Sequence, residues 1–178
     1  MKNFAKMVGI IALAAVIGFS MAACGDGNGG GGGGGDGADP ALNGTWVDSE
    51  GGKIVLNNGA ITVSNDNVEI MKGTYSTSGS NMTVTFTQVT GAIFGGEEGG
   101  AEWGLSTSQW YTEQQVKAAI VQTLLAEEEM SQAEAEEMYD EMFEDFSPFG
   151  STTGAYTLSG NTLTVILGGE GAQTYTKQ

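Results

Sequence analysis

The chain has 178 residues with six lysines, no arginine, no histidine and 22 acidic residues, so its formal net charge at pH 7 is −16. Such an acidic protein is repelled by phosphate backbones, which excludes nucleic acid as a partner. Without histidine and with one cysteine, the chain can build no zinc site from His and Cys and lacks the usual general base. We therefore expect no metal, no cofactor and no enzymatic activity; the enzymatic alternative left open is a hydrolase that uses carboxylates.

The first 23 residues have the composition of a secretory signal peptide. Lys2 and Lys6 give a positively charged start, and an apolar run follows at 7–19. A run of about 7–15 apolar residues after positive charge is typical of an export signal, whereas a membrane-spanning helix needs about 20. We therefore predict a signal peptide over residues 1–23 and an exported protein.

The end of this segment, Met21-Ala22-Ala23-Cys24, resembles the lipobox of bacterial lipoproteins. In that family the signal peptide is cut before the cysteine, whose thiol receives a diacylglyceryl group. The resemblance implies that Cys24 is lipidated and holds the protein to membrane lipid in the cell envelope. Because Gly25 rather than Asp follows, resemblance to Gram-negative lipoproteins favours the outer membrane. The alternatives are a plain signal peptide, or an uncleaved anchor with an incidental cysteine.

Residues 24–40 form a glycine-rich tether with an unbroken glycine run at 29–35. Such a segment buries no apolar surface and would lose much conformational entropy on ordering. A flexible linker of about 15 residues has an r.m.s. reach of roughly 20 Å. The tether therefore separates the lipid anchor from a single folded domain, residues 41–178.

Short strands with alternating apolar residues dominate this domain. Asn58-Gly59 is the dipeptide favoured in a two-residue type I′ turn, and the register it sets pairs Leu56 with Ile61. We expect a bend or bulge at Gly73. Eight short antiparallel strands with tight turns fit a closed barrel or a sandwich. The predicted strands are 44–48, 53–57, 60–64, 68–77, 81–88, 154–158, 162–168 and 172–177.

The segment at 73–84 aligns without gaps with the segment at 154–165, which indicates two equivalent hairpins. A turn on the Ser-Gly pair of each copy would place Tyr75 opposite Met82, and the tyrosine of the second copy opposite Leu163. In the strand after each turn, apolar side chains alternate mainly with Thr, a pattern typical of strands with one buried face.

A long insertion, about residues 93–150, separates the fifth and sixth strands. It begins with a loop rich in Gly and Glu at 95–100. A capping-box pattern precedes each of two helices, which we predict at about 113–129 and 132–146. Each helix has one apolar face, and the opposite faces carry most of the acidic residues.

Residues 43–46 (Asn-Gly-Thr-Trp) open the strand region, and this Gly-x-Trp pattern resembles the first strand of lipocalins and of the wider calycin barrels. The likeness to lipocalin-like bacterial lipoproteins covers about residues 42–92 and 154–178. It implies a mainly β protein: an eight-stranded antiparallel lipocalin-like barrel with the two-helix insertion between strands five and six. It also implies an interior that often holds an apolar ligand, and a Trp46 that closes the barrel floor.

Three functions are compatible with this organisation. The first is non-catalytic binding of a small apolar ligand in the barrel, with the helices as a lid. The second is a protein–protein interaction module of the cell envelope that uses the acidic helices or a sheet edge. The third is the carboxylate-dependent hydrolase. The residues expected to line a ligand pocket are Phe86, Trp103, Trp110, Met138, Met142 and Phe143. Their alternative role is structural: the tryptophans anchor the insertion onto the sheet, and the others fill the core.

The lipobox can be tested by labelling. Growth of the producing bacterium with a labelled fatty acid should label the wild-type protein and leave a Cys24→Ala variant unlabelled, because the cysteine thiol is the expected acceptor. The measurement is the label on the purified protein after gel electrophoresis. Label that persists in the variant, or that is missing from the wild type, would contradict acylation of Cys24.

Overall fold

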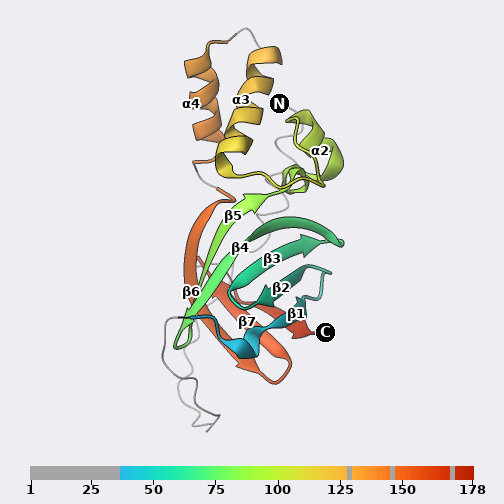
Figure 1. Cartoon of the computed structure of the whole chain (residues 1–178), viewed down its shortest axis with the longest axis vertical. Coiled ribbons are helices and arrows are strands. Elements are labelled where there is room, and N and C mark those ends of the chain that lie inside the picture. Colours follow the sequence, from blue (N-terminus) through green and yellow to red (C-terminus); the bar gives the residue numbers. More distant parts are fainter. Residues whose placement is uncertain (1–36, 128–129, 145–146, 169–170) are drawn as a thin grey trace.

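The structure, a computed structural model, describes residues 37–178 except 128–129, 145–146 and 169–170 (Figure 1). The predicted signal peptide at 1–23, Cys24 and the tether up to residue 36 lie outside the described residues. The described part consists of a barrel with a group of helices at one end (Figure 1).

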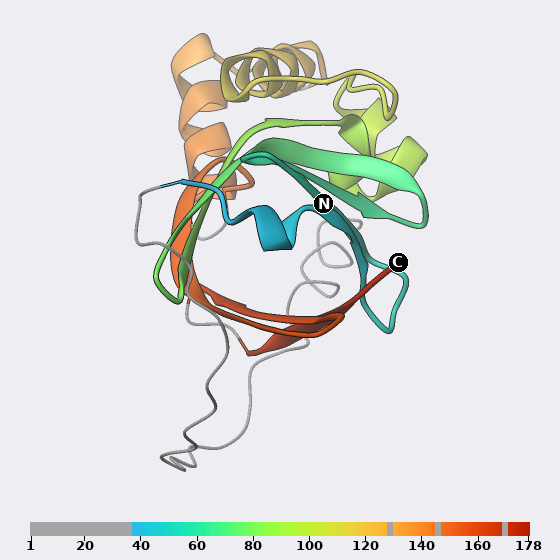
Figure 2. The ribbon, with the colours of Figure 1, turned by 60° about the horizontal axis from the view of Figure 1, so that its bottom comes forward.

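Eight antiparallel strands close into a barrel (Figures 1 and 2). Each strand pairs with the next along the chain, and β8 completes the ring by pairing with β1, where Lys177 lies opposite Trp46. The predicted eight-stranded antiparallel barrel is therefore confirmed. The strands are β1 (Gly44–Val47), β2 (Lys53–Asn57), β3 (Ala60–Asn65), β4 (Val68–Ser78), β5 (Asn81–Val89), β6 (Gly150–Ser159), β7 (Thr162–Leu167) and β8 (Gln173–Lys177).

The chain between β5 and β6 forms the helical insertion. Its elements are η2 (Gly91–Phe94), α2 (Gly96–Glu102), α3 (Glu113–Glu127) and α4 (Gln132–Met142). The two predicted helices are confirmed as α3 and α4. The second helix ends at Met142, because Phe143 caps α4, so the prediction of helix at 143–144 is wrong; residues 145–146 lie outside the described residues. Pro148 follows shortly, and a proline disfavours helical backbone in the residue before it.

The prediction of a loop at 95–100 is also wrong, because residues 96–102 form α2. Glu97 and Glu98 lie in the first turn, where negative charge stabilises a helix. The glycines let this helix approach neighbouring backbone: a Cβ added at Gly99 would collide with the carbonyl oxygen of Phe94. Close packing of the backbone thus outweighs the low helix propensity of glycine.

The β2–β3 hairpin has the predicted register. Asn58 and Gly59 have positive φ angles of 48° and 89°, as a type I′ turn requires. Leu56 consequently lies opposite Ile61, and both side chains are buried inside the barrel.

The two repeated hairpins differ from their prediction in the position of the turn. Gly79 and Gly160 occupy the first of the two turn residues with φ of 60° and 56°, a position that favours glycine in a two-residue hairpin. The turns are therefore Gly-Ser and Gly-Asn, and Tyr75 lies opposite Val84 rather than Met82. In the second copy, the partner of Tyr156 is Val165 rather than Leu163. The displacement is two residues, so every side chain keeps its predicted face.

Equivalent glycines mark the same place in both copies of the repeat. A Cβ at Gly73 would collide with the carbonyl oxygen of Thr85, and one at Gly154 would collide with that of Ile166. The register of β4 and β5 shifts between Lys72 and Gly73, which confirms the predicted irregularity. The repeat therefore preserves two points at which one strand passes unusually close to its neighbour.

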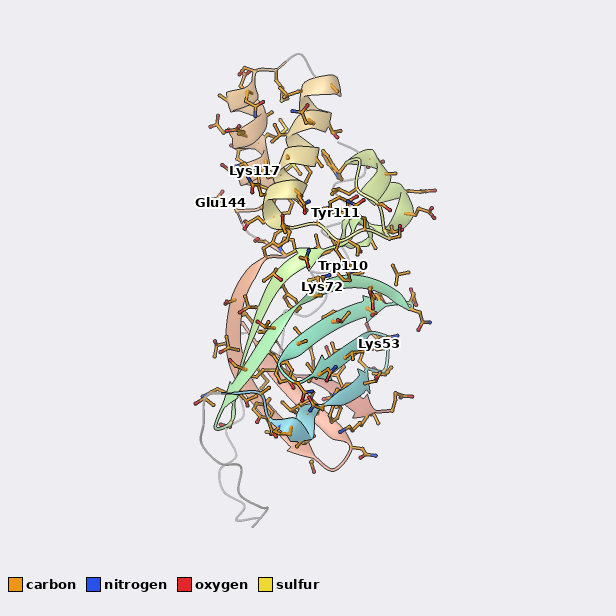
Figure 3. The ribbon with its side chains drawn as sticks, viewed as in Figure 1. Lys53, Lys72, Trp110, Tyr111, Lys117 and Glu144 are labelled. Carbon is orange, nitrogen blue, oxygen red and sulfur yellow. The ribbon has the colours of Figure 1, made fainter. Side chains whose placement is uncertain are left out.

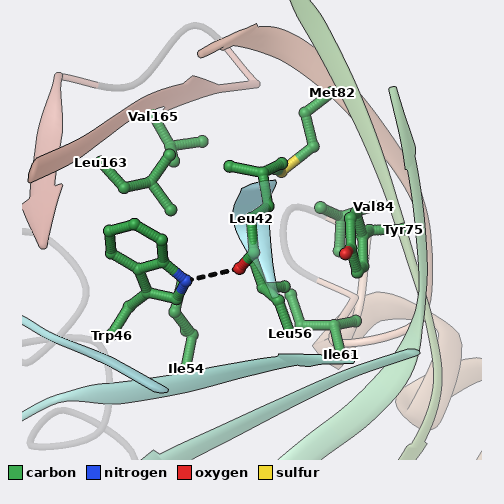
Figure 4. Packing of buried hydrophobic residues seen from close by; sticks show 10 residues of the cluster. All are labelled: Leu42, Trp46, Ile54, Leu56, Ile61, Tyr75, Met82, Val84, Leu163 and Val165. Carbon is green, nitrogen blue, oxygen red and sulfur yellow. Dashed lines mark hydrogen bonds between the residues drawn. The ribbon is translucent and has the colours of Figure 1, made fainter. Parts of the chain in front are cut away.

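A short 3₁₀ helix, η1 (Pro40–Leu42), closes one end of the barrel (Figure 2). The Leu42 side chain is fully buried, and its carbonyl oxygen accepts a 2.7 Å hydrogen bond from Trp46 Nε1 (Figure 4). We call η1 the plug and this end of the barrel the closed end. The buried side chains around the plug are Trp46, Ile54, Leu56, Ile61, Tyr75, Met82, Val84, Leu163 and Val165.

The insertion has a hydrophobic cluster of its own. Its buried residues are Val89, Phe94, Leu105, Val116, Ile120, Val121, Leu124, Ala135 and Tyr139. All but Val89, the last residue of β5, belong to the insertion, so the apolar faces of α3 and α4 are covered mainly by each other. Among the described residues, no helix is long and apolar enough to cross a membrane.

Leu42→Ala should lower the free energy of unfolding by about 2–5 kcal/mol, because it leaves a cavity among the buried side chains of the closed end. Ile166→Ala is the matched control, since that side chain is 41% exposed and its loss should cost less than about 1 kcal/mol. Urea denaturation measures both. Equal losses in the two variants would contradict a structural role for the plug.

Candidate functional site

The six residues predicted to line a ligand pocket do not converge on one site. Phe86 of β5 is half-buried against the barrel cluster. Trp103, Met142 and Phe143 pack against the cluster of the insertion, where the Phe143 ring lies 4.7 Å from that of Tyr139 between centroids. The two remaining residues lie elsewhere: Met138 is exposed on α4, and Trp110 lies where the insertion joins the barrel (Figure 3).

That joint is built from aromatic and backbone contacts. Lys72 of β4 places Nζ 4.4 Å from the centroid of the Trp110 ring (Figure 3), a cation–π contact. Tyr111 forms a β-bridge with Val89, and its hydroxyl accepts a 2.9 Å hydrogen bond from the Ser106 backbone N–H. Trp110 thus contacts a barrel strand, which is the arrangement expected for its alternative role as an anchor of the insertion.

A polar network fastens the entering chain to the closed end. The Asn43 amide oxygen accepts hydrogen bonds from the Asn58 backbone N–H at 2.8 Å and from the Tyr75 hydroxyl at 3.2 Å. The Tyr156 hydroxyl donates to Asp39 at 3.2 Å. Burial raises the pKa of both tyrosines, and the negative charge of Asp39 raises it further. The two hydroxyls therefore stay protonated near neutral pH and act as hydrogen-bond donors rather than nucleophiles.

Lys177 of β8 completes this network. Its Nζ lies 5.1 Å from the centroid of the Trp46 ring and 3.3 Å from the carbonyl oxygen of Ala41. The lysine thus joins the plug, the first strand and β8. Within this closed-end network, the sequence assigned a role in closing the barrel to Trp46 alone. The contacts of Tyr75, Tyr156 and Lys177 join segments far apart in the chain.

The outer face of the helical hairpin α3–α4 is its most polar surface. A shallow depression on α4 is lined by Ala133, Glu136, Glu137, Asp140, Glu141 and Glu144. Lys117 of α3 donates a 2.6 Å hydrogen bond to Asp140 in an exposed ion pair, and such pairs contribute little to stability. The capping box predicted for Ser131 is confirmed, and its hydrogen bonds lower the pKa of Glu134.

Within the described ranges, no group of three or more Asp, Glu, His or Cys side chains is arranged to hold a metal ion. The fold defines a closed eight-stranded antiparallel barrel with a helical insertion between β5 and β6. Comparison of the chain with protein-family models, with curated proteins and with solved structures found no match.

The buried Tyr139 makes the stability of the hairpin depend on alkaline pH. Burial, followed by the negative charges of Glu113 and Asp140, raises the pKa of Tyr139 from 10 to about 12. Its contribution is present below pH 10 and is lost as the pH rises towards 12, because the unfolded chain then ionises first. Tyr139→Phe should therefore retain more of its stability between pH 10 and 12 than the wild type, as measured by urea denaturation at each pH. If the free energy of unfolding falls equally with pH in the two proteins, Tyr139 does not cause the alkaline loss of stability.

Proposed function

We propose that the protein is a lipid-anchored, non-catalytic interaction module of the cell envelope. The barrel is the scaffold, and the helical hairpin α3–α4 contacts a partner protein. The observation that carries the proposal is the division of the fold into two hydrophobic clusters, one inside the barrel and one inside the insertion. The hairpin is consequently a separately packed element that projects from the barrel (Figure 1).

The filled closed end of the barrel supports a scaffold role. Leu42 and Trp46 are fully buried there, and they occupy the space that a ligand would need (Figure 4). A barrel of eight strands is just wide enough for side chains to fill its interior. The carboxylates of α4 face solvent on an open surface, which supports a binding role over acid–base catalysis, since catalytic carboxylates need perturbed surroundings.

The charge of the hairpin indicates the chemistry of its partner. Glu136, Glu137 and Glu141 are exposed on one face of α4, and a surface of one sign attracts a partner of the opposite sign and raises its association rate. We propose a partner protein with a basic surface.

Binding of a small apolar ligand stays the second candidate. The observation that favours it is a set of half-buried apolar side chains against the barrel cluster, among them Val63, Phe86, Leu167 and Tyr175. A ligand bound there would enter from the end of the barrel opposite the plug.

Photo-crosslinking in cells distinguishes the two candidates. A photoreactive amino acid at Glu137 of the full-length protein should give a discrete crosslinked product, whereas the same group at Thr153 should not. Both positions are exposed, and Thr153 belongs to β6 in the wall of the barrel rather than to the hairpin. Glu136→Gln together with Glu141→Gln should reduce the product at Glu137 several-fold.

Crosslinking at neither position, together with saturable uptake of an apolar fluorescent probe, would overturn the interaction module in favour of the ligand-binding barrel. Equal crosslinking at both positions would show that the hairpin is not the contact surface. Circular dichroism of each variant verifies that the barrel is intact.

A further inference from the structure

The charge distribution and the path of the chain give the folded domain two distinct poles. We infer that the domain stands on a lipid surface with the closed end of the barrel toward the headgroups and the helical hairpin as the membrane-distal pole. The inference rests on the proposed acylation of Cys24.

The chain enters the described domain at the closed end. Gly37, the first described residue, forms a β-bridge with Thr77 near the end of β4, and the Thr77 hydroxyl donates to its carbonyl oxygen at 2.8 Å. The plug and its hydrogen bonds fasten the next residues to the same end. An anchor upstream of Gly37 is therefore attached to the barrel at the pole opposite the hairpin.

The closed end carries almost no side-chain charge. The hairpin turns that meet there are Asn58-Gly59, Gly79-Ser80 and Gly160-Asn161, all of them neutral. Among the described residues at this end, the charged side chains are Asp39 and Lys177, which carry opposite signs. This pole can approach an anionic headgroup layer without net repulsion.

The opposite end is strongly acidic. Asp48 and Glu50 follow β1, and Asp66 lies in the turn between β3 and β4. The insertion, residues 91–149, attaches at the same end and contains 14 acidic residues and one lysine. Nearly all the negative charge of the folded domain thus belongs to the pole farthest from the chain entry.

The tether and the charge distribution affect the orientation of the domain in different ways. The 13 residues at 24–36 can span at most about 45 Å, so the anchor alone permits the domain to tilt. Repulsion from anionic lipid acts within about one Debye length, about 8 Å at physiological ionic strength. It therefore opposes those tilts that bring the hairpin down to the surface, and it leaves the neutral closed end free to approach.

Energy transfer to labelled lipid measures the orientation. The acylated Cys24 has no free thiol, so a cysteine added to the full-length lipidated protein is its single labelling site. Ser80→Cys places a dye at the closed end and Ala133→Cys places one on α4; both residues are exposed. The two sites lie on the order of 40 Å apart along the barrel and α3. Vesicles of phosphatidylcholine, with or without phosphatidylglycerol, carry an acceptor on the headgroup.

Transfer should be several-fold more efficient from position 80 than from position 133. Phosphatidylglycerol should lower the efficiency from position 133 further, and 1 M salt should remove that effect, because the Debye length falls to about 3 Å. Equal efficiencies, or a higher efficiency from position 133, would overturn the orientation.

Flotation of the wild-type protein separates this inference from the proposal on which it rests. If the wild type fails to float with vesicles, or if Cys24 itself takes up the dye, acylation is wrong and the orientation falls with it. If the wild type floats and remains unlabelled but the two positions give equal transfer, the orientation alone is overturned.

Discussion

The hydrogen bond from Trp46 Nε1 to the carbonyl oxygen of Leu42 links the entering chain to the wall of the barrel. A buried indole N–H must find an acceptor, and here the acceptor belongs to the segment that fills the barrel. The bond thereby holds Leu42 among the inward side chains of the strands, and Lys177 Nζ lies over the indole ring. The plug, β1 and β8 consequently meet in one small region, and the packing of the closed end depends on these contacts.

Much of the barrel could be predicted because short stretches of sequence determine the strands and their turns. Alternation assigns a face to each strand residue, and Asn58-Gly59 fixes one register through the sign of φ. The turn positions of the two repeated hairpins were missed, because the Ser-Gly pair overlaps with Gly-Ser in the first copy and with Gly-Asn in the second. Only the requirement for glycine at the first turn residue separates the two possibilities. Residues 96–102 were missed as a helix because their glycines reflect close backbone contacts, which propensity does not describe.

The candidate site could be predicted less well, and the reason is also physical. The period of a helix shows that Tyr139, Met142 and Phe143 share a face, but it does not show what covers that face. The structure covers it with α3 and η2 rather than with the barrel interior. Residues from β5 and from α4 that looked suited to one pocket therefore belong to two separate clusters, a distinction that depends on contacts between distant segments.

The barrel and the insertion differ both in their hydrophobic clusters and in their charge. The barrel carries the internal repeat and the neutral turns of its closed end. The insertion carries its own apolar core and the bulk of the acidic residues. The two parts meet through the joint at Trp110 and Tyr111 and through Val89 of β5 and Met71 of β4. These contacts do not involve the outer face of α3 or α4, so we expect changes to that face to leave the packing of the barrel largely untouched.

The pairing of β8 with β1 also has a consequence for biogenesis. A partly synthesised chain that lacks residues 173–177 cannot complete the ring, however much of the sheet has already formed. Until then β1 and β7 retain free edges that can pair with other chains, and pairing between segments so distant in sequence is slow. The nascent domain therefore passes through an aggregation-prone open sheet, and a holding chaperone would be most effective in the interval before the last strand arrives.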